Sequence, residues 1–209
     1  MLNNSYQDFM EQFFQAYYQK LAGENDALAL RLPLSDKDQA MLLDPMIKSE
    51  WKQWKLVRSD LKESDFSKLE NELNIKLPEI FKAFLGTYYH YFDNPIGPNP
   101  ISEPFKALKR AWNPYLVQCG YLPFAWDEDG YYIICCDLSY LPDELSCPIC
   151  QIDHEILFDL TDEYEDEYED EYEDEADSEF EINKELRQNI AANMEQLAPD
   201  LCSYLKGFL

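Results

Sequence analysis

Residues Glu70–Tyr89 read ENELNIKLPEIFKAFLGTYY, and this stretch decides how the rest of the chain is organised. It predicts the end of one helix, a stop at Leu77-Pro78 and a second helix, because proline suits the first turn of a helix, where its missing N–H would be unpaired anyway. Beyond the proline, apolar residues recur at steps of three and four, which places them on one helical face. We therefore expect Phe81, Phe84 and Leu85 to lie in the core.

Upstream of this stretch the pattern is helical. Ser5–Leu21 has helical apolar spacing and a very aromatic face, which we expect to pack on the domain; the alternative is a docking surface for a partner. Ala27–Leu34 is predicted to be extended, and Ser35 to cap a helix that runs to about Leu43. Pro45 is expected to begin another helix, with its two tryptophans, Trp51 and Trp54, as core anchors.

Downstream, the pattern changes to short apolar runs with turn signals between them. Tyr121–Ala125 and Tyr131–Cys136 flank an Asp-Gly turn and predict a hairpin. The remaining expected elements are strands at Pro148–Asp153 and Glu155–Leu160 and helices at Glu103–Trp112, Phe180–Leu197 and Pro199–Phe208. The predicted fold class is α+β, with a central, mostly antiparallel sheet of about four to six strands covered by helices.

The central stretch also resembles a known signature. The order of a Leu-Glu helix, a Leu-Pro step and a helix ending in Phe-Leu is similar to that of the SUKH superfamily, the Smi/Knr-like proteins. The residues that carry this likeness are Leu69-Glu70, Leu73, Leu77-Pro78, Phe81 and Phe84-Leu85. The later segments Tyr121–Ala125, Asp127–Gly130, Tyr131–Asp137 and Cys147–Glu155 resemble the strands and the tight turn of the family.

The resemblance implies a function as well as a fold. It implies a non-catalytic immunity protein of a polymorphic toxin system, which binds a cognate toxin, often a nuclease, and neutralises it. The alternative that it implies is a regulatory or scaffolding adaptor, like the fungal cell-wall-synthesis regulators of the same superfamily. A hydrolase or a metalloprotein is the third interpretation, and it has the least support in the sequence.

The net charge limits the classes of partner, and the N-terminus indicates the cellular location. The chain of 209 residues carries 42 acids against 17 lysines and arginines, a formal net charge of -25. Such a surface repels nucleic acid and anionic membranes and attracts basic proteins, so we expect a basic protein toxin as partner and no direct nucleic acid or membrane binding. The N-terminus has Asp8 and Glu11 before any basic residue and no long apolar run, which predicts a cytoplasmic protein.

Cysteine and histidine offer one pattern that could bind a metal. Cys147 and Cys150 form a CxxC and His154 follows four residues later, but zinc needs about four ligands. A fourth could come from Cys135 or Cys136, not both, since neighbours on a strand point to opposite faces. We expect no metal, no cofactor and no catalytic residue. His90, in an aromatic run, is expected to be a packed core or rim residue.

One segment differs from all others. Asp162–Asp177 reads DEYEDEYEDEYEDEAD and contains twelve acids. Repulsion among so many like charges argues against an isolated helix and predicts a solvated, disordered insert. The alternative hypothesis is that the acidic run mimics nucleic acid, so that its carboxylates attract and occupy a basic groove of the partner. The candidate partner-binding residues are Asp127, Glu128 and Asp129 in the hairpin turn and Tyr164, Tyr168 and Tyr172 in the acidic run.

These observations predict four regions. Residues 1–60 form an N-terminal helical extension packed on the domain, and residues 61–160 form the SUKH-like core. Residues 161–179 are the acidic low-complexity insert, and residues 180–209 supply C-terminal helices that complete the core.

Overall fold

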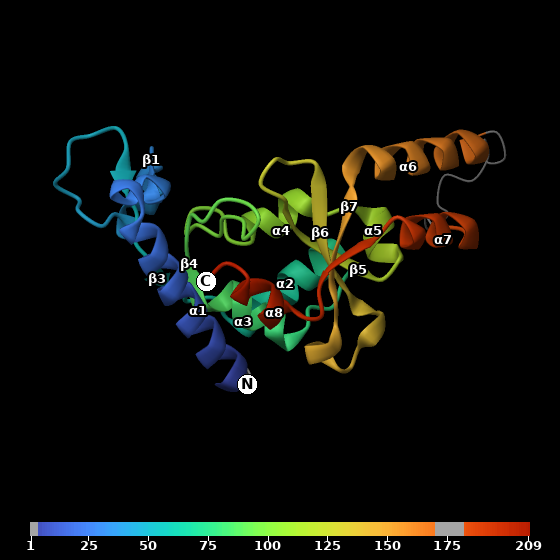
Figure 1. The fold of residues 1–209 in the computed structure, drawn as a ribbon, viewed down its shortest axis with the longest axis horizontal. Helices are drawn as coiled ribbons and strands as arrows, with labels where there is room; N and C mark the ends of the chain where they lie inside the picture. The colour runs from blue at the N-terminus through green and yellow to red at the C-terminus, as the bar shows by residue number, and fades with distance from the viewer. Residues whose placement is uncertain (1–3, 170–181) are drawn as a thin grey trace.

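The structure, a computed structural model, describes residues 4–169 and 182–209, and it combines helices with antiparallel sheets (Figure 1). The largest sheet in this part of the chain has the order β5-β6-β7-β8, and all neighbouring strands in it are antiparallel. Its strands are β5 (Tyr121–Trp126), β6 (Tyr132–Asp137), β7 (Ile149–Asp153) and β8 (Glu195–Ala198). The expected mixture of helices with a central antiparallel sheet is therefore confirmed.

The β5–β6 hairpin forms as the sequence predicts. Tyr121 lies opposite Asp137, and Trp126 lies opposite Ile133. Gly130 has a φ of 77°, the left-handed conformation that the tight turn requires. Pro123 is tolerated because β5 lies at one edge of the sheet, where the missing N–H breaks no ladder on the outer side.

The sheet is buried on both faces, which explains why its central strands are apolar without alternation. On one face, Ile134 and Cys136 of β6 and Ile149 of β7 join the main core. On the other face, Ile133 and Ile152 join a second cluster, which also contains residues of helices α5, α6 and α7.

Two helices around the Leu77-Pro78 step form the main core. Helix α2 (Glu63–Leu73) ends at Asn74 in the left-handed conformation, and helix α3 (Glu79–Thr87) begins directly after the proline. Phe81, Phe84 and Leu85 are all buried, as predicted. The rings of Phe81 and Phe124 are 5.2 Å apart, so α3 packs directly on β5.

A buried lysine joins these two helices. The Nζ atom of Lys82 on α3 lies 2.9 Å from Glu63, 3.2 Å from Glu79 and 3.6 Å from Glu70. Glu70 also accepts a hydrogen bond of 3.0 Å from the backbone N–H of Leu77. Burial opposes the charge of Lys82, but the hydrogen bonds to Glu63 and Glu79 prevail and raise its pKa.

Helix α1 (Asn4–Gly23) packs on this core through its aromatic face. The ring of Phe14 stacks on Phe84 at 5.6 Å and on Phe92 at 6.1 Å. Met10, Phe13 and Phe14 are buried. The packed interpretation of this face is therefore confirmed. Helix α8 (Leu201–Lys206) lies beside α1 and α3 in Figure 1. Phe208 follows α8 in the chain, and its ring lies 6.0 Å from the ring of Tyr17.

The segment between α1 and α2 differs from the prediction. It consists of 3-10 turns η1 (Asn25–Leu30) and η2 (Asp36–Met41) and short strands β1 (Arg31–Leu32), β2 (Lys52–Gln53) and β3 (Val57–Arg58). Strand β1 pairs with β2, and β3 pairs with β4 (Tyr88–Tyr89). Ser35 caps η2 as expected, with its hydroxyl accepting from the N–H of Lys37.

The helix predicted after Pro45 is absent from the described structure, and this prediction was wrong. Trp54 is 0% exposed, as a core anchor should be, whereas Trp51 is 57% exposed. The physical reason is the pairing of β1 with β2, which makes the backbone extended, so that residues three apart no longer share a face.

Helices α4 (Lys106–Ala111) and α5 (Pro114–Gln118) lead into the sheet. The expected helix at Glu103–Trp112 thus begins three residues late. Asn113 caps α5 by accepting a hydrogen bond from Leu116, and Pro114 occupies the first turn. The Asn-Pro pair ends one helix and begins the next.

Two predictions for the C-terminal third were wrong: the strand at Glu155–Leu160, and disorder at the start of the acidic insert, Asp162–Glu169. Glu155–Leu160 is not a strand but the start of helix α6 (His154–Glu169), which also takes in the first residues of the expected insert. Leu157 and Thr161 are buried against the domain, and α7 (Lys184–Ala192) lies beside α6 (Figure 1), so packing offsets the repulsion among its carboxylates. The rest of the insert, residues 170–179, lies outside the described residues.

The helix expected from Phe180 to Leu197 ends early. Helix α7 stops at Ala192, and the chain then forms β8, which pairs with β7 through Gln151 and Glu195. Strand β7 has backbone groups that need partners on this side, and such long-range pairing is not encoded in local periodicity. The segment from Leu138 to Ser146 contains the short turns η3 (Leu138–Tyr140) and η4 (Glu144–Ser146).

Candidate functional site

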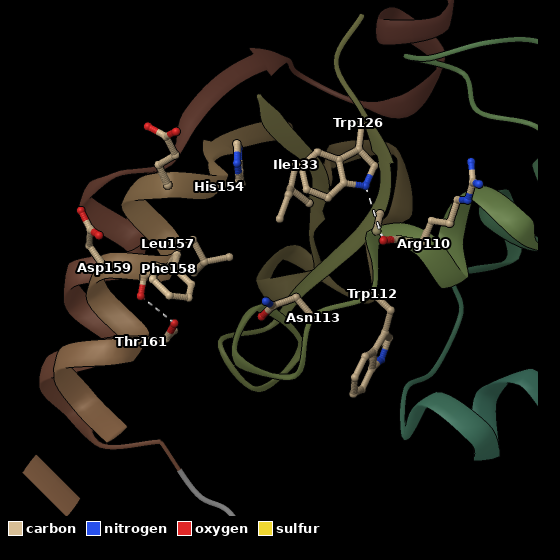
Figure 2. Close-up of a pocket in the computed structure, with 12 residues that line it drawn as sticks. Arg110, Trp112, Asn113, Trp126, Ile133, His154, Leu157, Phe158, Asp159 and Thr161 are labelled. Atoms are coloured by element: carbon tan, nitrogen blue, oxygen red, sulfur yellow. Dashed lines mark hydrogen bonds between the residues drawn. The ribbon is translucent and has the colours of Figure 1, made fainter. Parts of the chain in front are cut away.

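A pocket of about 600 Å³ opens between helix α6 and the turn that joins α4 to α5 (Figure 2). We call it the aromatic pocket, because Trp112, Trp126, His154 and Phe158 border it. Figure 2 shows these side chains arranged around one space, with the Arg110 side chain extending away from it. Phe158 is 63% exposed, so its ring is accessible to a partner.

The two tryptophans are held by their indole N–H groups. Trp112 follows the last residue of α4 and donates to the backbone oxygen of Leu73 at 3.4 Å. Trp126 at the end of β5 donates to the backbone oxygen of Arg110 at 3.5 Å. Because both polar groups are occupied by the backbone, each indole offers only its apolar ring to the pocket.

The start of α6 forms the opposite wall. Strand β7 ends at Asp153, whose carboxylate accepts a hydrogen bond of 2.8 Å from the N–H of Glu155 and so caps the helix. The Nδ1 atom of His154 lies 2.8 Å from the backbone oxygen of Tyr131. Since that oxygen can only accept, Nδ1 carries a proton, and the other ring nitrogen of a neutral His154 is then an acceptor.

Carboxylates outnumber the one arginine, Arg110, among the residues that line the aromatic pocket. Glu155 and Asp159 line it from α6, one helical turn apart, and the exposed Asp162 follows on the same helix. Aromatic ring faces and carboxylates both attract cations, and lysine and arginine side chains suit such a site because their stems are apolar. The arrangement can therefore bind a basic segment of a protein.

The predicted acidic turn borders a different hollow. Asp127, Glu128 and Asp129 line a depression of about 330 Å³ together with Tyr204 and Phe208. Asp127 holds the turn, since its carboxylate accepts a hydrogen bond of 2.8 Å from the N–H of Tyr132. Glu128 and Asp129 are exposed.

The predicted tyrosines lie further along the chain. Tyr164 and Tyr168 fall within the backbone of α6, and Tyr172 lies outside the described residues. The described structure does not join the acidic turn and these tyrosines into one site.

Sequence reasoning missed the rings of the aromatic pocket. The sequence pattern places Trp126 in the turn between the two hairpin strands, and Phe158 in the expected strand Glu155–Leu160. A signal was present, because Leu157, Leu160 and Thr161 follow helical spacing, which leaves Phe158 on the outer side of a helix.

The thiols form no cluster with histidine. Cys150 lies opposite Cys135 in the β6–β7 pair, and its Sγ atom donates to the backbone oxygen of Cys135 at 3.7 Å. Cys147 donates instead to the backbone oxygen of Asp143 at 3.6 Å. Burial raises the pKa of Cys150 to about 12, so its thiol is protonated and a poor metal ligand near neutral pH. Within the described residues, no group of three or more His, Cys, Asp and Glu could hold a metal ion.

The other histidine is enclosed by aromatic rings. His90 is 1% exposed, and its ring lies 4.9 Å from Phe14 and 5.0 Å from Phe92. Burial lowers its pKa to about 3, so the ring is neutral at ordinary pH. The expectation that His90 is a packed residue is confirmed.

Within residues 4–169 and 182–209, no helix has both the length and the apolar character needed to cross a bilayer. Comparisons of the chain with protein-family models, with curated proteins and with solved structures found no match.

Proposed function

We propose that the chain is a non-catalytic immunity protein that binds a basic cognate toxin, a nuclease, in the cytosol and blocks its active surface. One observation carries this proposal: the aromatic pocket and the acidic run share helix α6. Phe158, Glu155 and Asp159 lie on the first two turns of that helix, and the sequence continues into the densest acidic segment of the chain.

The two features contribute different parts of binding. A lysine or arginine of the toxin placed over Trp112 or Phe158 gains about 0.5–2 kcal/mol from the ring, depending on how far the contact is desolvated. The acidic run acts over a longer distance and raises the association rate, because the net charge of -25 attracts a basic partner. The rings therefore anchor the complex, and the carboxylates guide its formation.

We also propose that the core has a SUKH-like arrangement. The order of its elements supports this: α2, a Leu-Pro step and α3 precede the strands β5, β6 and β7, and helices close the chain. This is the order in which the family-like segments follow one another in the sequence.

The first experiment searches the neighbouring genes for a candidate toxin with a C-terminal nuclease module and uses that module in purified form. Nuclease activity is titrated with the full chain. Loss of activity at one chain per toxin, together with co-purification of the two, is the expected result. Full nuclease activity at a large excess of the chain would refute the immunity function, and binding without inhibition would favour the adaptor alternative.

Variants then test the aromatic pocket. Phe158→Ala is expected to raise the dissociation rate of the complex, whereas Tyr140→Ala, which removes another exposed aromatic ring on η3, should not. Equal dissociation rates for the two variants would exclude the pocket as the anchor.

The charge contribution is tested separately. Asp159→Lys and Asp36→Lys change the net charge equally, but only Asp159 lines the aromatic pocket. The first variant should lower the association rate more than the second, and the difference should shrink at high salt. A difference that does not depend on salt would contradict electrostatic guidance by α6.

A further inference from the structure

A second pocket, of about 400 Å³, lies beside helix α4 and carries the opposite charge. The segment between α1 and α2 provides Arg31 and Trp51, and the segment between β4 and α4 provides Tyr91 and Asp93. Helix α4 adds Lys106 and Arg110. We call it the cationic pocket. Arg110 lines both pockets, and Figure 2 shows its side chain extending away from the aromatic pocket.

The cationic pocket has a local excess of positive charge on an otherwise acidic protein. In the part of the chain that the structure describes, Arg31 and Arg110 form no ion pair. Lys106 pairs with Glu103 at 2.8 Å. The pocket thus gathers three cations, Arg31, Lys106 and Arg110, against the single carboxylate of Asp93 among its lining residues, an excess of positive charge that suits an anion.

One residue that lines the cationic pocket, Tyr91, is held in place by a hydrogen bond. The hydroxyl of Tyr91 donates to the fully buried carboxylate of Asp38 at 2.5 Å, and Ser102 donates to the same carboxylate through its N–H and its hydroxyl at 2.7 and 2.6 Å. This cluster joins η2 to the chain after β4 and fixes the Tyr91 side chain, which lines the pocket. Such preorganisation lowers the cost of binding.

An aromatic ring and a carboxylate complete the cationic pocket. Trp51 is exposed although it borders the pocket, which leaves a ring face available for stacking. Asp93 would repel a phosphate group but can accept hydrogen bonds from hydroxyl or amino groups. The pocket thus offers separate partners for an anion, for a planar ring and for hydrogen-bond donors.

We propose that the cationic pocket binds a nucleoside phosphate. Arg31 and Arg110 contact the phosphate oxygens, since the guanidinium group matches phosphate with paired hydrogen bonds. Trp51 stacks on the base, and Asp93 accepts from the hydroxyls of the sugar or an amino group of the base. This inference goes beyond the proposed toxin binding and does not depend on it.

The test is titration calorimetry of the full chain with ADP, adenosine and inorganic phosphate. ADP is expected to bind at one site and more tightly than either fragment, because only ADP engages both the arginines and the ring. No binding of ADP, or inorganic phosphate binding as tightly as ADP, would overturn the proposal.

Variants locate the site. Arg31→Ala and Arg110→Ala should each weaken ADP binding by about tenfold or more, the usual cost of a lost hydrogen bond to a charged group. Lys109→Ala is the matched control: it removes a cation from the same helix, but Lys109 pairs with Glu72 at 3.1 Å and does not line the pocket. Trp51→Ala should weaken ADP but not inorganic phosphate. If the arginine variants bind ADP like the Lys109 variant, the cationic pocket is not the site.

Discussion

Replacing His90 by phenylalanine should change how the stability of the protein depends on pH. The His90 ring is buried between Phe14 and Phe92, and its Nδ1 atom has no hydrogen-bond partner among the described residues. Its backbone pairs with Asn99 in both directions at 3.0 Å, and this pairing does not need the imidazole. Phenylalanine has a similar shape and cannot be protonated, so the substitution removes the titration and keeps the packing.

The magnitude follows from the two pKa values of His90. The native pKa is about 3, against an ordinary value of 6.5 in an unfolded chain. Between these values the unfolded chain binds a proton that the native protein does not, so the free energy of unfolding falls as the pH is lowered. The slope is about 1.4 kcal/mol per pH unit, which amounts to about 2 kcal/mol at pH 5 relative to neutral pH.

Urea unfolding at pH 8, 7, 6 and 5 measures this effect in the native chain and in His90→Phe. The difference between the two curves is the useful quantity, because the many carboxylates contribute equally to both. Relative to the variant, the native chain should lose about 2 kcal/mol between pH 8 and pH 5. Parallel curves for the native chain and His90→Phe would show that His90 is not enclosed as the structure has it.

Three further substitutions test the core. Phe84→Ala should lower the free energy of unfolding by about 3–5 kcal/mol, because it leaves a cavity between α1 and α3; an unchanged melting temperature would contradict this. Lys82→Met should lower the free energy of unfolding by about 1–3 kcal/mol, because buried Glu70 would keep only the exposed Lys76, at 3.1 Å, as a counter-charge, and adding Glu70→Gln should restore part of the loss in a urea titration. Gly97→Ala should destabilise the protein by more than about 1 kcal/mol, since Gly97 has a φ of 80° and a new Cβ would lie 2.3 Å from the Cβ of Ala107. A melting temperature equal to that of the native chain would refute this.

Local patterns predicted the elements that local interactions specify. The Leu77-Pro78 step with its two helices, the aromatic helix α1 and the β5–β6 hairpin all depend on spacing, on a proline or on a glycine turn. Their buried residues could be read from periodicity because each element packs one regular face. The acidic character of the candidate partner surface was equally visible, since charge is a sum over residues.

The tertiary structure decided what distant parts of the chain do to one another. Strand β8 forms because β7 needs a partner, and Trp51 is exposed because β1 pairs with β2, contacts that no local window contains. Helix α6 extends into the acidic run because α7 and the domain stabilise its first turns. Both pockets are lined by segments that are far apart in sequence, from Arg31 to Arg110 in one and from Arg110 to Thr161 in the other. A binding site of this kind depends on positions in space, which local sequence patterns do not specify.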